Sequence, residues 1–79
     1  MKLPRDVSGH ELVKTLIRHW GYRQVNHVGS HIILQTDDPE HHRLAVPDHS
    51  PLRLGTFNGI LRAVARVKRV EREDIIACL

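Results

Sequence analysis

Apolar residues in this sequence are spaced as in a helix before Gly21 and as in strands after it. In the stretch 12–20 they recur at spacings of one, three and four, which places them on one stripe of a helix. Ser8 and Glu11 form a capping box, because each side chain reaches a free amide at the start of the helix. Gly21 suits the left-handed conformation at which helices commonly stop. The pattern therefore predicts a helix over residues 8–20.

After Gly21 the residue types favour extended structure. Two segments rich in strand formers are separated by a glycine and a serine, a pair that favours a tight turn. A third, shorter run ends at Pro47, because proline cannot donate a hydrogen bond to a sheet ladder. The sequence therefore predicts three antiparallel strands, over residues 22–28, 31–36 and 43–47.

Two helical patterns follow the strands. In the first, apolar residues recur at helical spacing over residues 57–64, which predicts a helix that begins at Gly55 or Thr56 and ends near Val67. In the second, residues 71–79 predict a short last helix whose acidic residues lie near the positive end of the helix dipole.

The element order α-β-β-β-α, with an extra C-terminal helix, predicts an α+β fold in a single domain, residues 1–79. A three-stranded antiparallel sheet needs one face covered, and two amphipathic helices in so short a chain lie most simply on that one face. Strand alternation then sorts the second strand. If Ile32 and Leu34 face the helices, His31 and Gln35 face the open side. The opposite register would bury His31, and the run of three apolar residues leaves both registers open.

Positive charge is concentrated in the second half of the chain. The whole sequence carries 12 Lys and Arg residues against 9 Asp and Glu. Between residues 43 and 70 a single acid, Asp48, accompanies six basic residues: Arg43, Arg53, Arg62, Arg66, Lys68 and Arg69. Such a segment attracts a phosphate-bearing partner at long range, although a solvated basic helix face gives the same count.

Composition argues against several classes of protein. Aromatic residues make up 4% of the chain, too few for a base-stacking platform. The single cysteine, Cys78, excludes an intramolecular disulfide and leaves a zinc site unsupported. His41, His42 and His49 do not change this, because adjacent histidines of a strand point to opposite faces. No apolar stretch approaches the roughly 20 residues of a membrane span. We therefore expect a soluble, cytoplasmic protein without a metal or small-molecule cofactor.

Short segments spread over nearly the whole chain carry a family resemblance. In sequence order they are Ser-Gly-His-Glu-Leu at 8–12, Gly-Tyr at 21–22, Gly-Ser-His at 29–31, Val-Pro-Asp-His at 46–49, Leu-Gly-Thr-Phe at 54–57 and Ile-Leu-Arg at 60–62. Together they resemble HicA-type toxins, the ribonuclease half of HicA–HicB toxin–antitoxin pairs. The resemblance implies a fold like that of double-stranded RNA-binding domains, cleavage of mRNA, and neutralisation by a HicB-like antitoxin. It also implies that His31 is the catalytic residue.

Histidine suits RNA cleavage without a metal. The 2′-hydroxyl of RNA is a nucleophile beside the scissile phosphate, so the reaction needs one group that removes its proton and another that protonates the leaving oxygen. Imidazole, with an ordinary pKa of about 6.5, serves in either role near neutral pH. We expect His31 to act as this acid or base. We expect the RNA contacts among the following residues: Gly29, Ser30, Arg43, His49, Arg53 and Arg62.

Two alternatives remain open from the sequence. In the first, the chain is a non-catalytic RNA-binding module of the same fold. In the second, it is a degenerate toxin that retains only antitoxin binding. Lysines at the start of the last long helix would favour the binding module, but residues 54–61 contain no lysine or arginine. The degenerate toxin is suggested by Val28 and Gln35, which stand where HicA-type toxins often carry basic residues.

Overall fold

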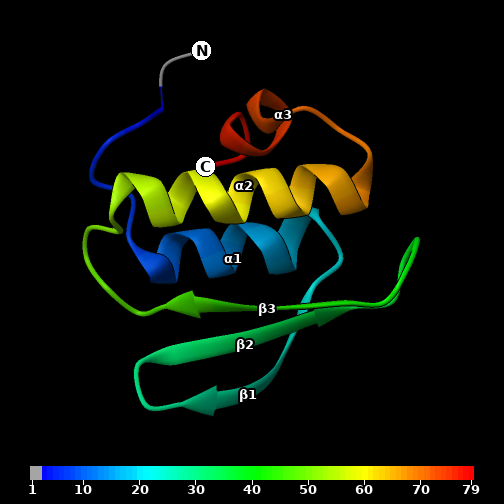
Figure 1. Ribbon diagram of the computed structural model, residues 1–79, viewed down its shortest axis with the longest axis horizontal. Coiled ribbons are helices and arrows are strands. Elements are labelled where there is room, and N and C mark those ends of the chain that lie inside the picture. The colour runs from blue at the N-terminus through cyan, green and yellow to red at the C-terminus, as the bar shows by residue number, and fades with distance from the viewer. Residues whose placement is uncertain (1–2) are drawn as a thin grey trace.

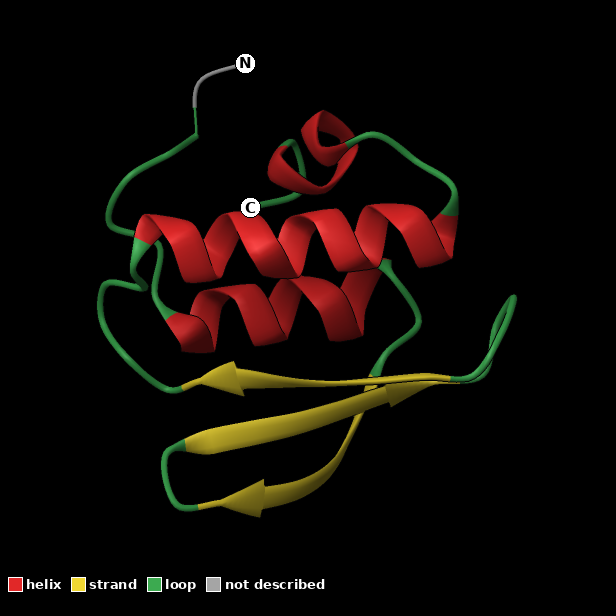
Figure 2. Ribbon diagram, viewed as in Figure 1, coloured by secondary structure: helices red, strands yellow, loops and turns green. Residues whose placement is uncertain are grey.

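The computed structural model describes residues 3–79 and has the predicted α+β arrangement (Figure 1). Residues 1–2 of the predicted domain lie outside the described part. The elements are α1 (Gly9–His19), β1 (Arg23–Val28), β2 (His31–Thr36), β3 (His42–Pro47), α2 (Leu54–Lys68) and α3 (Arg72–Ile76). The strands form one antiparallel sheet in the order β1-β2-β3. All three helices lie on the same side of this sheet, with α3 beyond α2 (Figure 2).

The first helix begins and ends close to its predicted limits. The Ser8 hydroxyl accepts a hydrogen bond from the amide of Glu11 at 3.0 Å, and the Glu11 carboxylate accepts one from the amide of Ser8 at 3.4 Å. Trp20 is the C-cap, and Gly21 follows with φ +70°. The predicted capping box and left-handed stop are therefore confirmed. Ile17, expected on the apolar stripe, lies at its margin and is exposed.

The register of β2 places its apolar residues on the helix side. Ile32 and Leu34 are buried and His31 is exposed, so the first of the two possible registers is confirmed. Directly paired residues of neighbouring strands share a face, which defines the opposite, open face of the sheet as three rows. The open face consists of Val28, His31 and Pro47; of Asn26, Ile33 and Ala45; and of Arg23, Gln35 and Arg43.

β1 is an edge strand, and all six of its residues are exposed. Its pairing with β2 is irregular between Gln24 and Asn26, where a bulge shifts the register. The Asn26 Oδ1 atom accepts a hydrogen bond from the amide of His27 at 2.8 Å. Such bulges and local bonds blunt a sheet edge against pairing with another chain.

The later helices differ from their predicted lengths. α2 begins one or two residues earlier than expected and ends one residue later, at Lys68. Arg69 then turns the chain with φ 59°, a conformation that glycine usually supplies. α3 is shorter than the predicted segment and covers Arg72–Ile76, with a capping box between Glu71 and Asp74. Its first turn carries acidic residues, as predicted.

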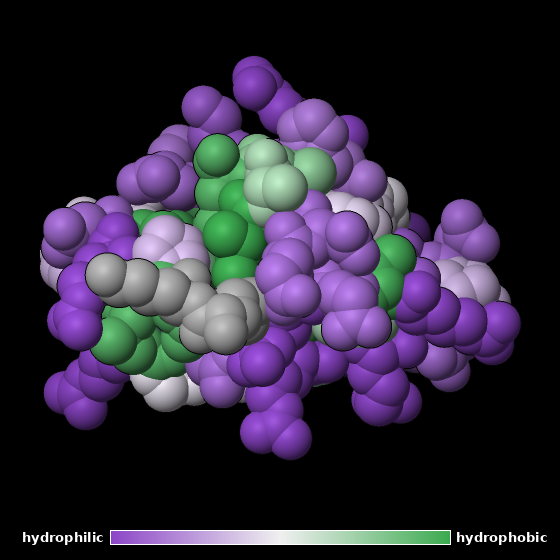
Figure 3. All heavy atoms as spheres, turned by 90° about the horizontal axis from the view of Figure 1, so that it is seen from above, coloured by the Kyte–Doolittle hydropathy of each residue, from purple (hydrophilic) through white to green (hydrophobic). Residues whose placement is uncertain are grey.

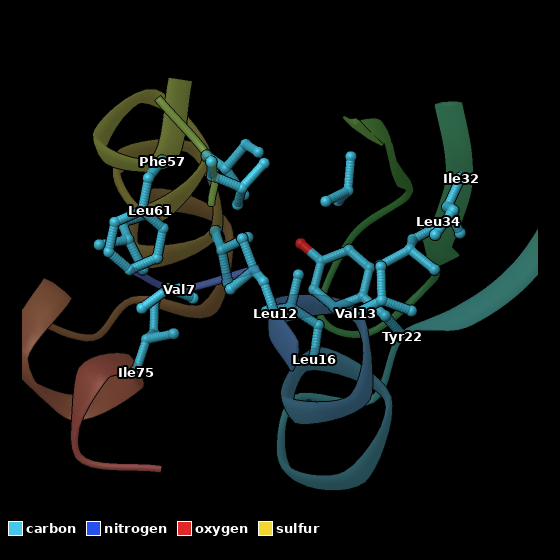
Figure 4. Packing of buried hydrophobic residues seen from close by; sticks show 14 of the residues in the cluster. Val7, Leu12, Val13, Leu16, Tyr22, Ile32, Leu34, Phe57, Leu61 and Ile75 are labelled. Carbon is cyan, nitrogen blue, oxygen red and sulfur yellow. The ribbon is translucent and has the colours of Figure 1, made fainter. Parts of the chain in front are cut away.

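The core lies between the helices and the sheet. Figure 4 shows the side chains of α1 in the middle, with those of α2 and α3 on one side and those of β2 on the other. The largest fully enclosed side chains are mostly aliphatic: Leu12, Leu16, Leu34, Thr36, Val46, Phe57, Leu61, Val64, Val67 and Ile75. The surface seen from above Figure 1 is mainly hydrophilic around a smaller apolar area (Figure 3). In the described part of the chain, no helix is long and apolar enough to span a membrane.

Candidate functional site

The turn between β1 and β2 carries His31 to an edge of the molecule. Gly29 has φ +58°, a left-handed conformation that a side chain would strain, so glycine is favoured at this point of the turn. Ser30 completes the turn and is exposed. His31 is the first residue of β2, and its side chain is exposed on the open face. The local sequence therefore presents a hydroxyl and an imidazole side by side at the end of a strand.

Hydrogen bonds tie this turn to the segment that follows β3. The amide of Asp48 donates to the carbonyl oxygen of Ser30 at 2.6 Å. The preceding residue, Pro47, is the cross-strand partner of His31. His49 directly follows Asp48 in the chain, so both contacts restrain the backbone beside it. The segments 29–31 and 46–49, which are separate motifs in the sequence, therefore lie together.

The start of α1 joins the same edge. The amide of Gly9 donates to the carbonyl oxygen of His49 at 2.9 Å. A Cβ atom at Gly9 would lie 1.9 Å from the carbonyl oxygen of Pro47, so only glycine permits this close approach without movement of the backbone. The amide of Leu52 donates to the carbonyl oxygen of Val7 at 2.8 Å, which fixes the loop before α2. Figure 1 shows these segments and the starts of α1 and α2 at one side of the view.

The imidazoles at this edge are available to a ligand. Within residues 3–79, the side-chain hydrogen bonds of histidine belong to His41 and His42. His31 and His49 are both exposed. Neither ring is used to hold the fold together.

The open face around His31 is largely apolar. Val28 and Pro47 lie beside His31 in the same row, and Ile33 and Ala45 follow in the next row. Val28 is 58% exposed, the most exposed large apolar side chain in the described part of the chain. This surface offers van der Waals contact rather than charge to whatever binds against His31.

The predicted basic contacts are not all at this edge. Arg53 is the N-cap of α2 and is exposed beside the loop that carries His49. Arg43 lies at the other end of β3, opposite Gln35 and about 13 Å from Pro47 along the strand. Arg62 lies on α2, about 12 Å along the helix from Leu54. The structure thus brings Gly29, Ser30 and His31 to the segment that carries His49. It places Arg53 at the start of α2, and it separates Arg43 and Arg62 from the 29–31 turn.

A second polar cluster, which the sequence did not indicate, lies between α2 and the sheet. The Tyr22 hydroxyl and Nδ1 of His42 share a hydrogen bond of 2.8 Å. Lys68 Nζ donates to Thr36 Oγ1 at 2.9 Å and to the carbonyl oxygen of Asp38, and it lies 5.0 Å from the centre of the Tyr22 ring. His42 was expected in a loop and is instead the first residue of β3. Only the tertiary contacts with Tyr22 and Lys68 reveal the cluster.

Burial changes the titration of two groups in this cluster. It raises the pKa of Tyr22 to about 12, because the phenolate would lose its hydration. It also lowers the pKa of His42, and the positive charge of Arg66 lowers that pKa further. Both side chains are therefore held neutral at physiological pH, which suits a structural hydrogen bond.

The three histidines weighed as metal ligands have different surroundings. His41 donates from Nδ1 to Asp37 Oδ1 at 2.9 Å, and Arg23 donates to Asp37 Oδ2 at 3.0 Å. The hydrogen bond from His41, followed by that from Arg23, lowers the pKa of Asp37. His42 bonds to Tyr22, and His49 lies at the opposite end of the sheet. Among residues 3–79, no group of three or more His, Cys, Asp or Glu side chains is arranged to hold a metal ion.

Comparison with known proteins adds no relative: no family model, no curated protein and no solved structure matches this chain.

Proposed function

We propose that this protein is a metal-independent endoribonuclease that cleaves mRNA, acting as the toxin of a toxin–antitoxin pair, with His31 as the acid or base. The observation that carries the proposal is the position of His31: its imidazole is exposed at an edge where the 29–31 turn, the loop after β3 and the start of α1 are tied together by backbone hydrogen bonds. This geometry leaves the ring available and its backbone fixed.

The chemistry needs only groups that lie at this edge. His31 removes the proton from the 2′-hydroxyl, the 2′-oxygen attacks phosphorus, and the bond from phosphorus to the 5′-oxygen breaks. The leaving oxygen takes a proton from a second acid, for which His49, in the segment bonded to the 29–31 turn, is the candidate, or from water. The Ser30 hydroxyl donates to a phosphate oxygen, and Arg53 offsets the negative charge of the transition state. Proton transfer by one placed imidazole is worth about 10²–10⁴-fold in rate.

The electrostatics of the edge also suit a phosphate. The first turn of α2 contains no acidic residue, and its N-cap, Arg53, uses no side-chain hydrogen bond to close the helix end. The positive end of the helix dipole and a guanidinium therefore lie together. An anion placed there is stabilised without a metal ion.

The test is cleavage of RNA by the purified chain in the presence of a chelator. We expect the His31→Ala variant to lose at least 100-fold in cleavage rate and to stop arresting growth when it is expressed alone. The matched control is His19→Ala, which removes an exposed histidine at the far end of α1. Cleavage by His31→Ala at the wild-type rate would refute the proposal, as would equal losses in both variants.

A second candidate function is supported by the apolar open face. A surface formed by Val28, Ile33, Ala45 and Pro47 suits a protein partner better than a phosphate backbone. A degenerate toxin that only binds a HicB-like antitoxin would use this face without cleaving RNA. A non-catalytic RNA-binding module of the same fold would instead bind RNA through its basic residues. RNA affinity that falls steeply with salt, without strand cleavage, would indicate the binding module. Salt-independent capture of a protein encoded by the neighbouring gene would indicate the degenerate toxin.

A further inference from the structure

The outward face of α2 carries two arginines, and a third follows at the end of the helix. Arg62 and Arg66 are spaced by four residues, so they project from one side of the helix about 6 Å apart along its axis. Arg69 is the C-cap, where the left-handed backbone ends the helical repeat. All three are exposed. The ion pairs formed within residues 3–79 join Asp37 to Arg23 and to His41, so no carboxylate holds any of the three guanidinium groups.

The same face begins with two glycines. Gly55 and Gly59 precede Arg62 at helical spacing, which puts all three on one line along α2. A Cβ atom at either glycine would meet no other atom within 4 Å, so no contact inside the protein requires glycine. Each glycine nevertheless costs intrinsic helix stability. The packing of the chain gives no reason for this cost.

Arg69 also has a conformational cost. It ends α2 with φ 59°, where the side chain of an L-residue is strained and glycine would not be. The glycines therefore lie where helix stability favours a side chain, and the arginine lies where the backbone favours glycine. A ligand that binds along this face accounts for both the glycines and the arginine, because the glycines allow close approach and the arginine supplies positive charge.

We propose that the outward face of α2, from Gly55 to Arg69, binds the phosphate backbone of single-stranded RNA outside the His31 edge. The glycines let the strand approach the helix, and Arg62, Arg66 and Arg69 contact successive phosphates. The face is roughly 21 Å long, which matches about six stacked nucleotides. It begins at Gly55, next to Arg53, so a strand on it leads to the proposed cleavage edge. Glu71, which lines the hollow beside Arg62, is an acidic group close to the path.

The inference rests on the proposed function only for the identity of the ligand, and its test does not require cleavage. The probe is a 2′-O-methyl oligonucleotide of mixed sequence, which lacks the reactive hydroxyl. Its affinity is measured by fluorescence anisotropy as a function of salt. The double variant Arg62→Gln with Arg66→Gln removes two charges from this face. Lys14→Gln with Arg18→Gln removes two charges at the same spacing from exposed positions on α1.

We expect the α2 double variant to bind at least tenfold more weakly and to lose about 1.4 from the slope of log affinity against log salt, because each phosphate contact on a single strand contributes about 0.7. The α1 control should change affinity less than twofold. Equal losses in both variants would mean that net charge alone matters and would overturn the inference. Unchanged binding by the α2 variant would also overturn it.

A third variant tests close approach of RNA to α2 without changing the charge of the protein and without destabilising its fold. Gly59→Gln adds a helix-forming, neutral side chain where there is open space. It should raise the thermal midpoint of unfolding and weaken RNA binding at least threefold. Binding at wild-type affinity would refute close approach of RNA at this face. If the face binds RNA as described and unmodified RNA is not cut, the proposed ribonuclease activity fails while this inference stands.

Discussion

At the scale of single residues, glycine and arginine occupy positions that local preference does not explain. Gly9 is required because the carbonyl oxygen of Pro47 occupies the space of a side chain. Gly59 has open space around it, and Arg69 takes a left-handed conformation without needing to be an arginine for the fold. No contact in the described part of the protein requires residues of the second kind, and this is the basis of the RNA contact proposed along α2.

Arg69→Gly should stabilise the fold. The substitution removes the strain of a side chain at φ 59°, and the higher conformational entropy of glycine in the unfolded chain offsets part of this gain. We therefore expect a net gain of about 0.5–1 kcal/mol in the free energy of unfolding. Urea denaturation followed by circular dichroism measures it. RNA affinity should fall in the same variant. A loss of stability would show that the Arg69 side chain has a structural role that its exposed position does not suggest.

Gly9→Ala and Gly59→Ala should have opposite effects. At Gly9 the new methyl group meets backbone at 1.9 Å, so the start of α1 must move away from β3, and we expect a loss of about 2 kcal/mol or more. At Gly59 the methyl group meets open space, and the gain in helix propensity should be about 0.5–1 kcal/mol. The two variants make the same chemical change, so their difference isolates the backbone contact. Similar stabilities would contradict the tight approach of α1 to Pro47.

At the scale of elements, local patterns predicted more than contacts between distant segments. The capping box of α1 and the stop at Gly21 depend on residues close in sequence, and both appear in the structure as predicted. For β2 the sequence predicted alternation and left two registers open, of which the structure has the one with His31 exposed. The bond between Lys68 and Thr36 joins residues 32 positions apart, and no periodicity signals it. His42 was assigned to a loop for the same reason, because its place in β3 depends on pairing with Thr36.

The contact between β3 and Tyr22 should make stability depend on pH. The folded state lowers the pKa of His42, so the unfolded chain binds more protons once the pH falls below the ordinary value of about 6.5. The stabilisation is complete above that pH and is lost as the pH falls through the lowered pKa. Thermal midpoints at pH 7.5 and pH 5 should differ more in the wild type than in His42→Gln. The control His19→Gln should keep the wild-type difference, and a pH response that is unaltered in His42→Gln would argue against this assignment.

At the scale of the whole molecule, the sequence shows how many basic residues lie in one segment of the chain, but not where the fold places each of them. The sequence placed six basic residues in one segment of the chain. The fold distributes them: Arg43 lies at the far end of the open face, Arg53 at the start of α2, Arg62 and Arg66 along α2 and Arg69 at its end, while Lys68 is bonded to Thr36. Three of the motif segments behaved in the opposite way, because residues 8–12, 29–31 and 46–49 are distant in sequence and came together at one edge. Neither outcome could be read from charge or spacing alone, since both depend on how the helices cross the sheet.

The hydrogen bond between Ser30 and Asp48 implies that the mobility of β1 and that of the 29–31 turn differ. β1 leads into the 29–31 turn, yet it buries none of its side chains, so its amides should exchange with deuterium faster than those of β2. The turn is anchored independently, from the other side, by the amide of Asp48. Fraying of β1 can therefore occur without displacing His31, and the candidate reactive group keeps its position while the edge strand opens and closes.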